Sequence, residues 1–299
     1  MRPALILAAL ALVSCSTPPQ SVDTTVPVAP TRTSTTTTLA PTTTTTVPTT
    51  TTTIPTTTTT TLPEGVTPPP DWLGTRPLPV DENGVGLAQP TPPEMVDRRF
   101  TSPDLLPPPA DGEFHSTTSE VLPEVMARST WVPECPVDID ELSYLTLSFW
   151  GFDQKPHTGE IIVNAMVAED VIEVFARLFE AKYPIEEIGI TTPADLEADP
   201  TGDGNVTESF VCRPVTGGSG WSQHAYGLAI DLNPFHNPYW KGDVVLPELS
   251  SAYLDRGRQL PGMIFDGDVV TSAFDDIGWG WGGRWNSLKD WQHFSRSGT

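Results

Sequence analysis

The chain has 299 residues, and 38 acidic side chains against 16 basic ones give it a formal net charge of -22 at pH 7. A protein this acidic has no basic stripe that could displace counterions from a phosphate backbone, which excludes nucleic acid as a partner. The same charge favours solubility and the retention of divalent cations.

The start of the chain has the pattern of an export signal. Met1-Arg2 precedes an apolar run, Ala4 to Val13, that is too short to span a bilayer and suits a signal peptide. It ends in Leu12-Val13-Ser14-Cys15, which resembles the lipobox of bacterial lipoproteins, where the signal is cut before a Cys that is then lipidated. We expect residues 1–15 to be this signal and Cys15 to anchor the protein outside the cytoplasm. An ordinary secretory signal that contains a Cys is the alternative.

The next two segments are rich in proline. Residues 16–70 include a run of almost pure Thr from Thr31 to Leu62, and this composition predicts a disordered tether or, alternatively, a glycosylated stalk. Residues 71–127 keep the prolines but add isolated large apolar side chains such as Trp72 and Phe100. We expect these residues to form an extended arm along the outside of the domain that follows.

Residues 128–299, about 170 residues, suffice for one hydrophobic core and are expected to form the catalytic domain. Alternating apolar residues predict strands at 142–151 and 160–164. Val171, Val174, Phe175, Leu178 and Phe179 fall at helical spacing, with two acids in the first turn and Pro184 beyond the end.

Shorter apolar runs complete the pattern. Residues 185–190, 227–232 and 291–294 are expected to be strands, and residues 268–277 a short helix. The mixture predicts an α+β fold in which helices flank a small, mostly antiparallel sheet.

The three cysteines suggest one disulfide. Lipidation would remove Cys15 and leave Cys135 and Cys212, which an oxidising compartment would favour as a pair. Their bond would close a loop of about 77 residues and contribute on the order of 4 kcal/mol in the chain-entropy model. Two unpaired buried thiols are the alternative.

The most informative residues lie in two short segments near the C-terminus. Ser222 to Asp231 contains His224 and Asp231, and Asp290-Trp291-Gln292-His293 adds an acid and a second imidazole. Two His and one carboxylate are typical of a catalytic zinc site, which keeps a fourth position for water, and a further acid can move the proton.

Strand periodicity places some of these groups together. If Leu228, Ile230 and Leu232 face the core, Asp231 points the opposite way, and Gly227 permits a turn that brings His224 to the same side. On an ideal strand Asp290 and His293 would lie on opposite faces, so a bulge or a strand entry is expected between them.

These segments resemble the VanY-type zinc D-alanyl-D-alanine carboxypeptidases and L-alanyl-D-glutamate peptidases, which cleave peptidoglycan peptides. The resemblance runs from Trp131 to Phe294 and includes Ser-x-His-x-x-Gly-x-Ala-x-Asp at 222–231, the Asn233-Pro234 step and the closing acid-x-x-His. It implies that His224, Asp231 and His293 bind Zn²⁺ and that Asp290 is the general base. It also implies a small α+β fold shared with the hedgehog signalling domain.

Two residues near the motif are candidates for substrate binding. Arg213 could grip a substrate carboxylate or developing oxyanion through its planar fork, or it could form a surface ion pair. Ser222 could hydrogen-bond substrate, or it could cap the turn that enters the motif.

For the remaining polar and aromatic candidates, a structural role is the alternative to a functional one. Asp199, Asp203, Gly204 and Asn205 recreate part of a calcium loop but lack its closing Glu, so a turn-rich loop beside the active site is expected. His157 could approach the substrate, although a position in a polar loop is the commoner outcome, and no role is expected for His115 or His236. Four glycine-interleaved tryptophans could form a flat wall for substrate, although packing is the commoner role; they are Trp279, Trp281, Trp285 and Trp291.

The sequence therefore predicts a monomeric zinc peptidase acting on peptidoglycan peptides by metal-activated water. The alternative is an inactive zinc-containing wall-binding or signalling module on the same fold, and Asp290 favours the enzyme because a structural zinc needs no such acid. Carboxypeptidase and endopeptidase specificity both remain open, since pocket shape and not the ligand set selects the bond.

Overall fold

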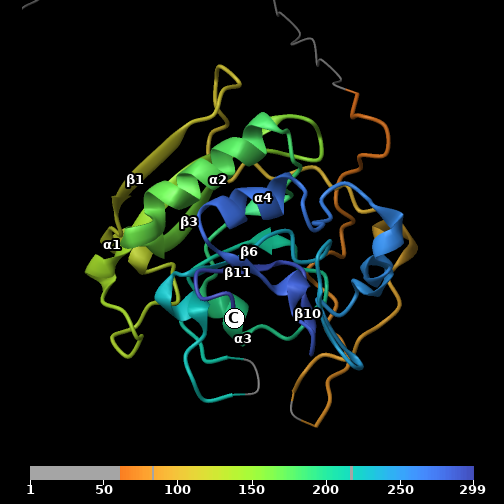
Figure 1. Ribbon diagram of the computed structural model, residues 1–299. Coiled ribbons are helices and arrows are strands. Elements are labelled where there is room, and N and C mark those ends of the chain that lie inside the picture. The colour runs from red at the N-terminus through yellow and green to blue at the C-terminus, as the bar shows by residue number, and fades with distance from the viewer. Residues whose placement is uncertain (1–60, 83, 216–217) are drawn as a thin grey trace, which may run out of the picture. The chain divides into compact units, whose positions relative to one another are not determined.

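The computed structural model describes residues 61–82, 84–215 and 218–299, all of which belong to one compact unit (Figure 1). The predicted signal, Cys15 and the Thr-rich run up to residue 60 lie outside the described residues. Within the described part, none of the helices has the length and apolar character needed to cross a bilayer.

The largest sheet is antiparallel, with strand order β1-β2-β3. Its strands are β1 (Ser116–Glu120), β2 (Leu142–Trp150) and β3 (Pro156–Asn164). The alternating apolar residues of β2, such as Leu145 and Leu147, are fully buried. Strand β3 starts before the predicted residue 160 because its pairing with β2 continues as far as Trp150 opposite Pro156.

Two helices cover the core. α2 (Ala168–Glu180) buries the predicted apolar face, with Glu169 and Asp170 in its first turn, and α4 (Val269–Asp276) starts at an Asp268 cap that accepts from the Thr271 amide at 2.9 Å. The helices lie next to each other above β6 and β11 (Figure 1). Their buried faces share one hydrophobic cluster with strand residues such as Ile230 and Phe294.

The other elements are short. A sheet of order β6-β11-β9 is formed by β6 (Ala229–Asp231), β11 (His293–Ser295) and β9 (Gly280–Trp281). A second sheet of order β10-β7-β8 is formed by β10 (Lys289–Asp290), β7 (Tyr239–Lys241) and β8 (Val244–Leu246). The remaining elements are a parallel pair, β4 (Glu187–Ile188) and β5 (Val206–Thr207), the helices α1 (Pro123–Met126) and α3 (Pro193–Glu197), and several 3₁₀ helices.

The predicted α+β class with mostly antiparallel pairing is confirmed, but the strands form several small sheets instead of one. The strand expected over 185–190 shortens to β4, because only its central residues find a partner in β5. The expected division of faces in β6 also differs, since Ala229 is as fully buried as Ile230.

The proline-rich arm, residues 71–127, contributes to the interior of the fold as well as to its surface. Met95 and Phe100 are buried in a cluster with Phe235 and Tyr253, and β1 supplies the third strand of the large sheet. Arg98 is also buried and forms an ion pair with Glu186 at 2.6 Å. The expected boundary at residue 128 is therefore not a division between two compact units in the described residues. The arm and the domain contribute side chains to the same interior and belong to one unit.

The structure contains the disulfide between Cys135 and Cys212, with a sequence separation of 77. Both cysteines pack against a cluster that includes Leu142, Ile162 and Phe210. The bond therefore joins the segment before β2 to the segment that leads towards His224.

Candidate metal centre

The first imidazole of the site is held by a short 3₁₀ helix, Gln223–Tyr226. Ser222 caps it, its hydroxyl accepting from the His224 amide at 3.3 Å, and Gly227 ends it in the left-handed region at φ 64°. A Cβ at Gly227 would meet the Asn164 amide nitrogen at 2.5 Å, so glycine is needed for both its conformation and its size. This turn directs the His224 side chain towards the end of β6.

The orientation of the His224 ring is fixed by a hydrogen bond from its Nδ1 atom, while Nε2 faces the site. Its Nδ1–H donates to the Ser209 carbonyl oxygen at 2.7 Å. This hydrogen bond selects the tautomer in which Nε2 carries a lone pair, which is the usual outer support of a metal-binding histidine.

The other two groups come from adjacent strands. β6 and β11 pair antiparallel with Asp231 directly opposite His293, which puts both side chains on one face of the sheet. The backbone of Asp231 pairs on its other side with Glu208, through bonds of 2.9 and 3.1 Å. Asp231 is thus held by backbone pairing on both edges.

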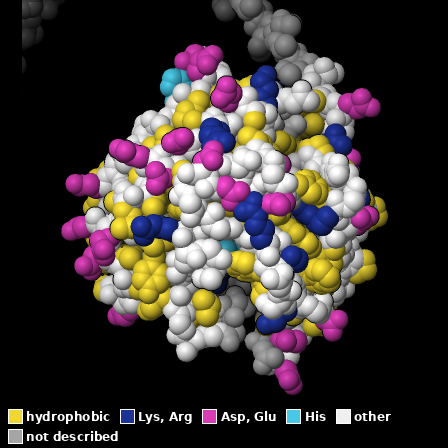
Figure 2. All heavy atoms as spheres, in the orientation of Figure 1, with side chains coloured by type: hydrophobic (Ala, Val, Ile, Leu, Met, Phe, Trp, Pro, Cys, Tyr) yellow, Lys and Arg dark blue, Asp and Glu magenta, His cyan; other side chains and the backbone are white. Residues whose placement is uncertain are grey.

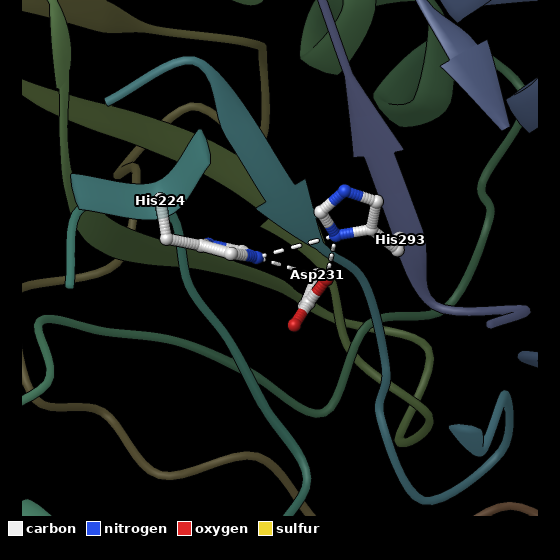
Figure 3. A group of neighbouring side chains, drawn as sticks. All are labelled: His224, Asp231 and His293. Atoms are coloured by element: carbon white, nitrogen blue, oxygen red, sulfur yellow. Dashed lines mark hydrogen bonds and ion pairs between the residues drawn. The ribbon is translucent and has the colours of Figure 1, made fainter. Parts of the chain in front are cut away.

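The three side chains converge on one point (Figure 3). The His224 Nε2 atom lies 3.3 Å from both His293 Nδ1 and Asp231 Oδ1, and the latter two atoms are 2.9 Å apart. Ligands about 2.0 Å from a tetrahedral zinc ion lie about 3.3 Å from one another. The donor types and their spacing therefore fit Zn²⁺ without rearrangement of the fold.

The electrostatics of the group also favour a cation. Burial would lower the pKa of His224, but the neighbouring Asp231 carboxylate raises it above the ordinary value. Burial would likewise raise the pKa of Asp231, yet the two imidazoles hold it well below its usual range. A positive charge at the centre of the group is thus strongly stabilised.

Asp290 lies beside this group on a different sheet. It ends β10, while His293 begins β11, so the chain passes from one sheet to another between them, which is the strand entry expected as the alternative to a bulge. Burial, and then repulsion from the Asp231 carboxylate, raises the pKa of Asp290 to about 7. Its Oδ1 atom is buried and has no hydrogen-bond partner among the described residues, and is free to accept from a molecule in the site.

The candidate ligands and Asp290 line a cleft of about 480 Å³. Figure 2 shows a hollow below the centre of this face, where Figure 1 shows β10 and the C-terminal end. Besides the four site residues, the cleft is bordered by Arg213, Trp221, Ser222, Tyr239, Lys241, Leu246 and Trp285.

Both predicted substrate-binding residues border this cleft. The Arg213 side chain forms no salt bridge in the described part of the chain and donates there only to the Pro214 carbonyl, at 3.3 Å. The surface ion pair considered for it is therefore absent there. Ser222 adopts the capping role, and its side chain also borders the cleft.

The tryptophans divide between the two expected roles. Trp279, Trp281 and Trp291 are buried in the core, whereas Trp285 borders the cleft with its ring 5.5 Å from that of His293.

The other histidines serve the fold. His157 lies on β3 and not in a polar loop, buried between the carboxylates of Asp104 and Asp153 at 2.8 and 3.0 Å. His115 contacts Asp111 at the surface, and His236 is buried.

The partial calcium loop has a structural use. Asp203 accepts from the Gly74 amide at 2.8 Å, and Asn205 donates to Glu186 at 2.9 Å. Both residues therefore support the buried Arg98, whose Nη1 donates to the Asp203 carbonyl.

Sequence reasoning missed two neighbours of the site, Tyr239 and Lys241. Both border the cleft from β7, and no motif or spacing marks them, because strand pairing alone brings β7 beside Asp290. Ser209 was missed for a different reason, because it contributes a backbone carbonyl, which no residue type marks in the sequence.

Comparison with known proteins agrees with the geometry. A family model described as D-alanyl-D-alanine carboxypeptidase matches residues 216–296. No curated protein and no solved structure matches the chain, so the expected similarity to the hedgehog fold stays a prediction. Residues 216–296, which carry all three candidate ligands and Asp290, are thus similar to the D-alanyl-D-alanine carboxypeptidase family, in agreement with the resemblance of the motifs.

Proposed function

We propose that this protein is a zinc-dependent peptidase that hydrolyses peptide bonds in bacterial peptidoglycan stem peptides. The observation that carries the proposal is the convergence of two imidazole nitrogens and one carboxylate oxygen, at the spacing of a tetrahedral zinc site, in a cleft that also holds a free carboxylate. The family match supports peptide hydrolysis as the reaction.

Different residues of the cleft bind the metal and transfer the proton. When bound by His224, Asp231 and His293, Zn²⁺ supplies a Lewis acid that makes a water proton acidic near neutrality. Asp290 accepts that proton through its free carboxylate oxygen and delivers it to the amine nitrogen as the peptide bond breaks. No covalent link between enzyme and substrate is needed.

The charges that border the cleft favour an anionic substrate. Arg213 and Lys241 are its only cationic lining residues among those described, and neither forms a salt bridge there. Arg213 can bind a peptide carboxylate through two parallel hydrogen bonds, which suits a carboxypeptidase that acts next to a free C-terminus. If the enzyme instead cleaves an L-Ala-D-Glu bond as an endopeptidase, Arg213 would bind the α-carboxylate of the D-Glu residue.

We further propose that the enzyme works outside the cytoplasm as a monomer, anchored through a lipid at Cys15. The apolar run and lipobox-like sequence at residues 1–15 support this location. Detergent partitioning of the wild type and of Cys15→Ser tests it. Equal release of both proteins into the aqueous phase would contradict the anchor.

Two variants test the assignment of the site. Asp290→Asn should retain one zinc per chain and lose hydrolysis of a defined muropeptide by about 10²- to 10⁴-fold, the usual contribution of an acid–base group. His224→Ala should lose both zinc and activity. Asp276→Asn, which removes an exposed carboxylate paired with Arg177, is the matched control and should behave as wild type.

Zinc content by mass spectrometry and product analysis by chromatography provide the two readouts. Full activity in Asp290→Asn would remove the assigned base. A wild type that holds zinc and cleaves no wall peptide would identify an inactive zinc module instead.

A further inference from the structure

Tyr239 occupies the position on β7 directly across from Asp290. The antiparallel pairing of β7 with β10 sets Asp290 opposite Tyr239, and side chains of such opposed residues lie on the same face of a sheet. Both residues border the cleft that contains the candidate metal ligands. The phenol therefore shares a wall of the cleft with the proposed general base.

The hydroxyl of Tyr239 is free, unlike those of three other tyrosines. Tyr144 donates to Glu160 at 2.8 Å, Tyr183 donates to the Gly262 carbonyl at 2.6 Å, and Tyr253 accepts from the Arg98 amide at 2.8 Å. Within the described residues Tyr239 makes no side-chain hydrogen bond although its side chain is half-buried. A half-buried phenol without a protein partner is available to a molecule in the cleft.

The protonation state of the Tyr239 phenol allows it to donate a hydrogen bond. Burial, and then the nearby Asp290 carboxylate, raises the pKa of Tyr239 above its ordinary value. The phenol therefore keeps its proton at neutral pH and can donate a hydrogen bond while Asp290 accepts one. The two side chains on this wall have complementary roles.

We propose that Tyr239 is a catalytic residue that donates a hydrogen bond to the oxygen of the scissile carbonyl as that oxygen becomes negative. When water attacks, a C–O bond forms and the carbonyl π electrons move to this oxygen. The Tyr239 proton stays on the phenol throughout, and Asp290 handles the proton released by the water. This inference rests on the proposed peptidase function.

Tyr239 then acts in the transition state and not only in substrate binding. A donor aimed at developing charge lowers kcat when it is removed, whereas a residue that binds substrate and transition state equally raises KM alone. Lys241 and Leu246 border the same wall and are free to contact the rest of the peptide. Kinetics can therefore separate the two roles.

The test compares Tyr239→Phe with wild type, which differs from it by one hydroxyl group. We expect kcat to fall about 10- to 100-fold with KM changed less than about threefold, because one donor to a charged group is lost. Zinc content should stay at one per chain. Tyr144→Phe, which removes a phenol bonded to Glu160, is the matched control and should keep wild-type kinetics.

A binding measurement provides a readout besides turnover. A phosphinate dipeptide, whose tetrahedral P–O⁻ resembles the developing oxyanion, should bind Tyr239→Phe at least about tenfold more weakly in calorimetry. The product amino acid should bind both proteins equally.

Unchanged kcat in Tyr239→Phe, a rise in KM alone, or equal phosphinate affinity would each overturn the proposal. These outcomes require an active, zinc-loaded wild type. An inactive wild type that also fails to bind the phosphinate would instead overturn the proposed function on which the inference rests.

Discussion

Two buried histidines show how surroundings decide what an imidazole does. His224 faces a carboxylate, which raises its pKa, and presents Nε2 to the candidate metal site. His236 lies 4.8 Å from the Phe152 ring, centroid to centroid, and donates from Nε2 to the Arg98 carbonyl at 2.9 Å. Burial lowers the pKa of His236 to about 3, so it is neutral in the folded protein.

His236 should make the stability of the protein depend on pH. The unfolded chain binds a proton at this residue below about pH 6.5, and the folded chain does so only near pH 3. Stability is therefore complete above pH 6.5 and falls as pH drops towards 3, with a contribution from His236 of about 2 kcal/mol between pH 7 and 5. Denaturant unfolding at both pH values measures it, and His236→Gln should lose this part of the dependence. An NMR titration of His236 with a midpoint near 6.5 would contradict the assignment.

The sequence indicates the donor residues of the site but not their neighbours. His224, Asp231, Asp290 and His293 belong to motifs that combine histidine and aspartate at fixed spacing, which made them predictable. Tyr239 belongs to no motif and reaches the cleft only because β7 pairs with β10.

The turn that holds His224 depends on one element boundary. Gly227 ends the 3₁₀ helix at φ 64°, and any Cβ there would also lie 2.9 Å from the Val163 carbonyl carbon. The helix can direct His224 towards Asp231 only if the chain reverses at this residue. The sequence predicted this turn, because glycine alone combines such a conformation with such close packing.

Gly227→Ala should therefore destabilise the protein by about 2 kcal/mol or more and weaken zinc binding by displacing His224. The matched control is Gly204→Ala, because a Cβ at Gly204 would meet no atom within 4 Å, and its effect should stay within about 0.5 kcal/mol. Denaturant unfolding and zinc titration of both variants provide the comparison. Equal stability of the two variants would show that the turn tolerates a side chain.

Elements with strong periodicity were predictable and short ones were not. α2 and β2 carry many apolar residues at one period, and their positions follow from the sequence. The short strands β7, β8 and β10 have no such pattern, since partners distant in sequence define them. The break between Asp290 and His293 is an exception, because their three-residue spacing predicted a bulge or a strand entry there.

On the scale of the whole molecule, the proline-rich arm is part of the fold. Arg98 enters the interior and meets Glu186 through two hydrogen bonds of 2.6 and 2.9 Å. Glu186 donates from its backbone to Asn233, two residues beyond Asp231. The arm is thus linked to the strand that carries a candidate metal ligand. Composition suggested an arm along the outside of the domain, because a single buried arginine leaves no periodic signal.

Arg98→Met should destabilise the protein by about 3–5 kcal/mol, since it leaves the Glu186 carboxylate buried without its partner. Arg99→Met is the control, because Arg99 pairs with the more exposed Asp97 and its loss should cost no more than about 1 kcal/mol. Thermal and denaturant unfolding compare the variants. Similar losses in both would mean that the arm does not anchor the interior.

The proposed function requires that His224, Asp231 and His293 bind one zinc ion and that peptide hydrolysis depends on it. The most direct measurement is hydrolysis of a defined stem peptide by chelator-stripped protein as zinc is added back. We expect no turnover without metal and full recovery at one equivalent of zinc, with a sharp break in the titration. Turnover that survives removal of the metal, or a zinc-loaded protein that leaves every stem peptide intact, would contradict it.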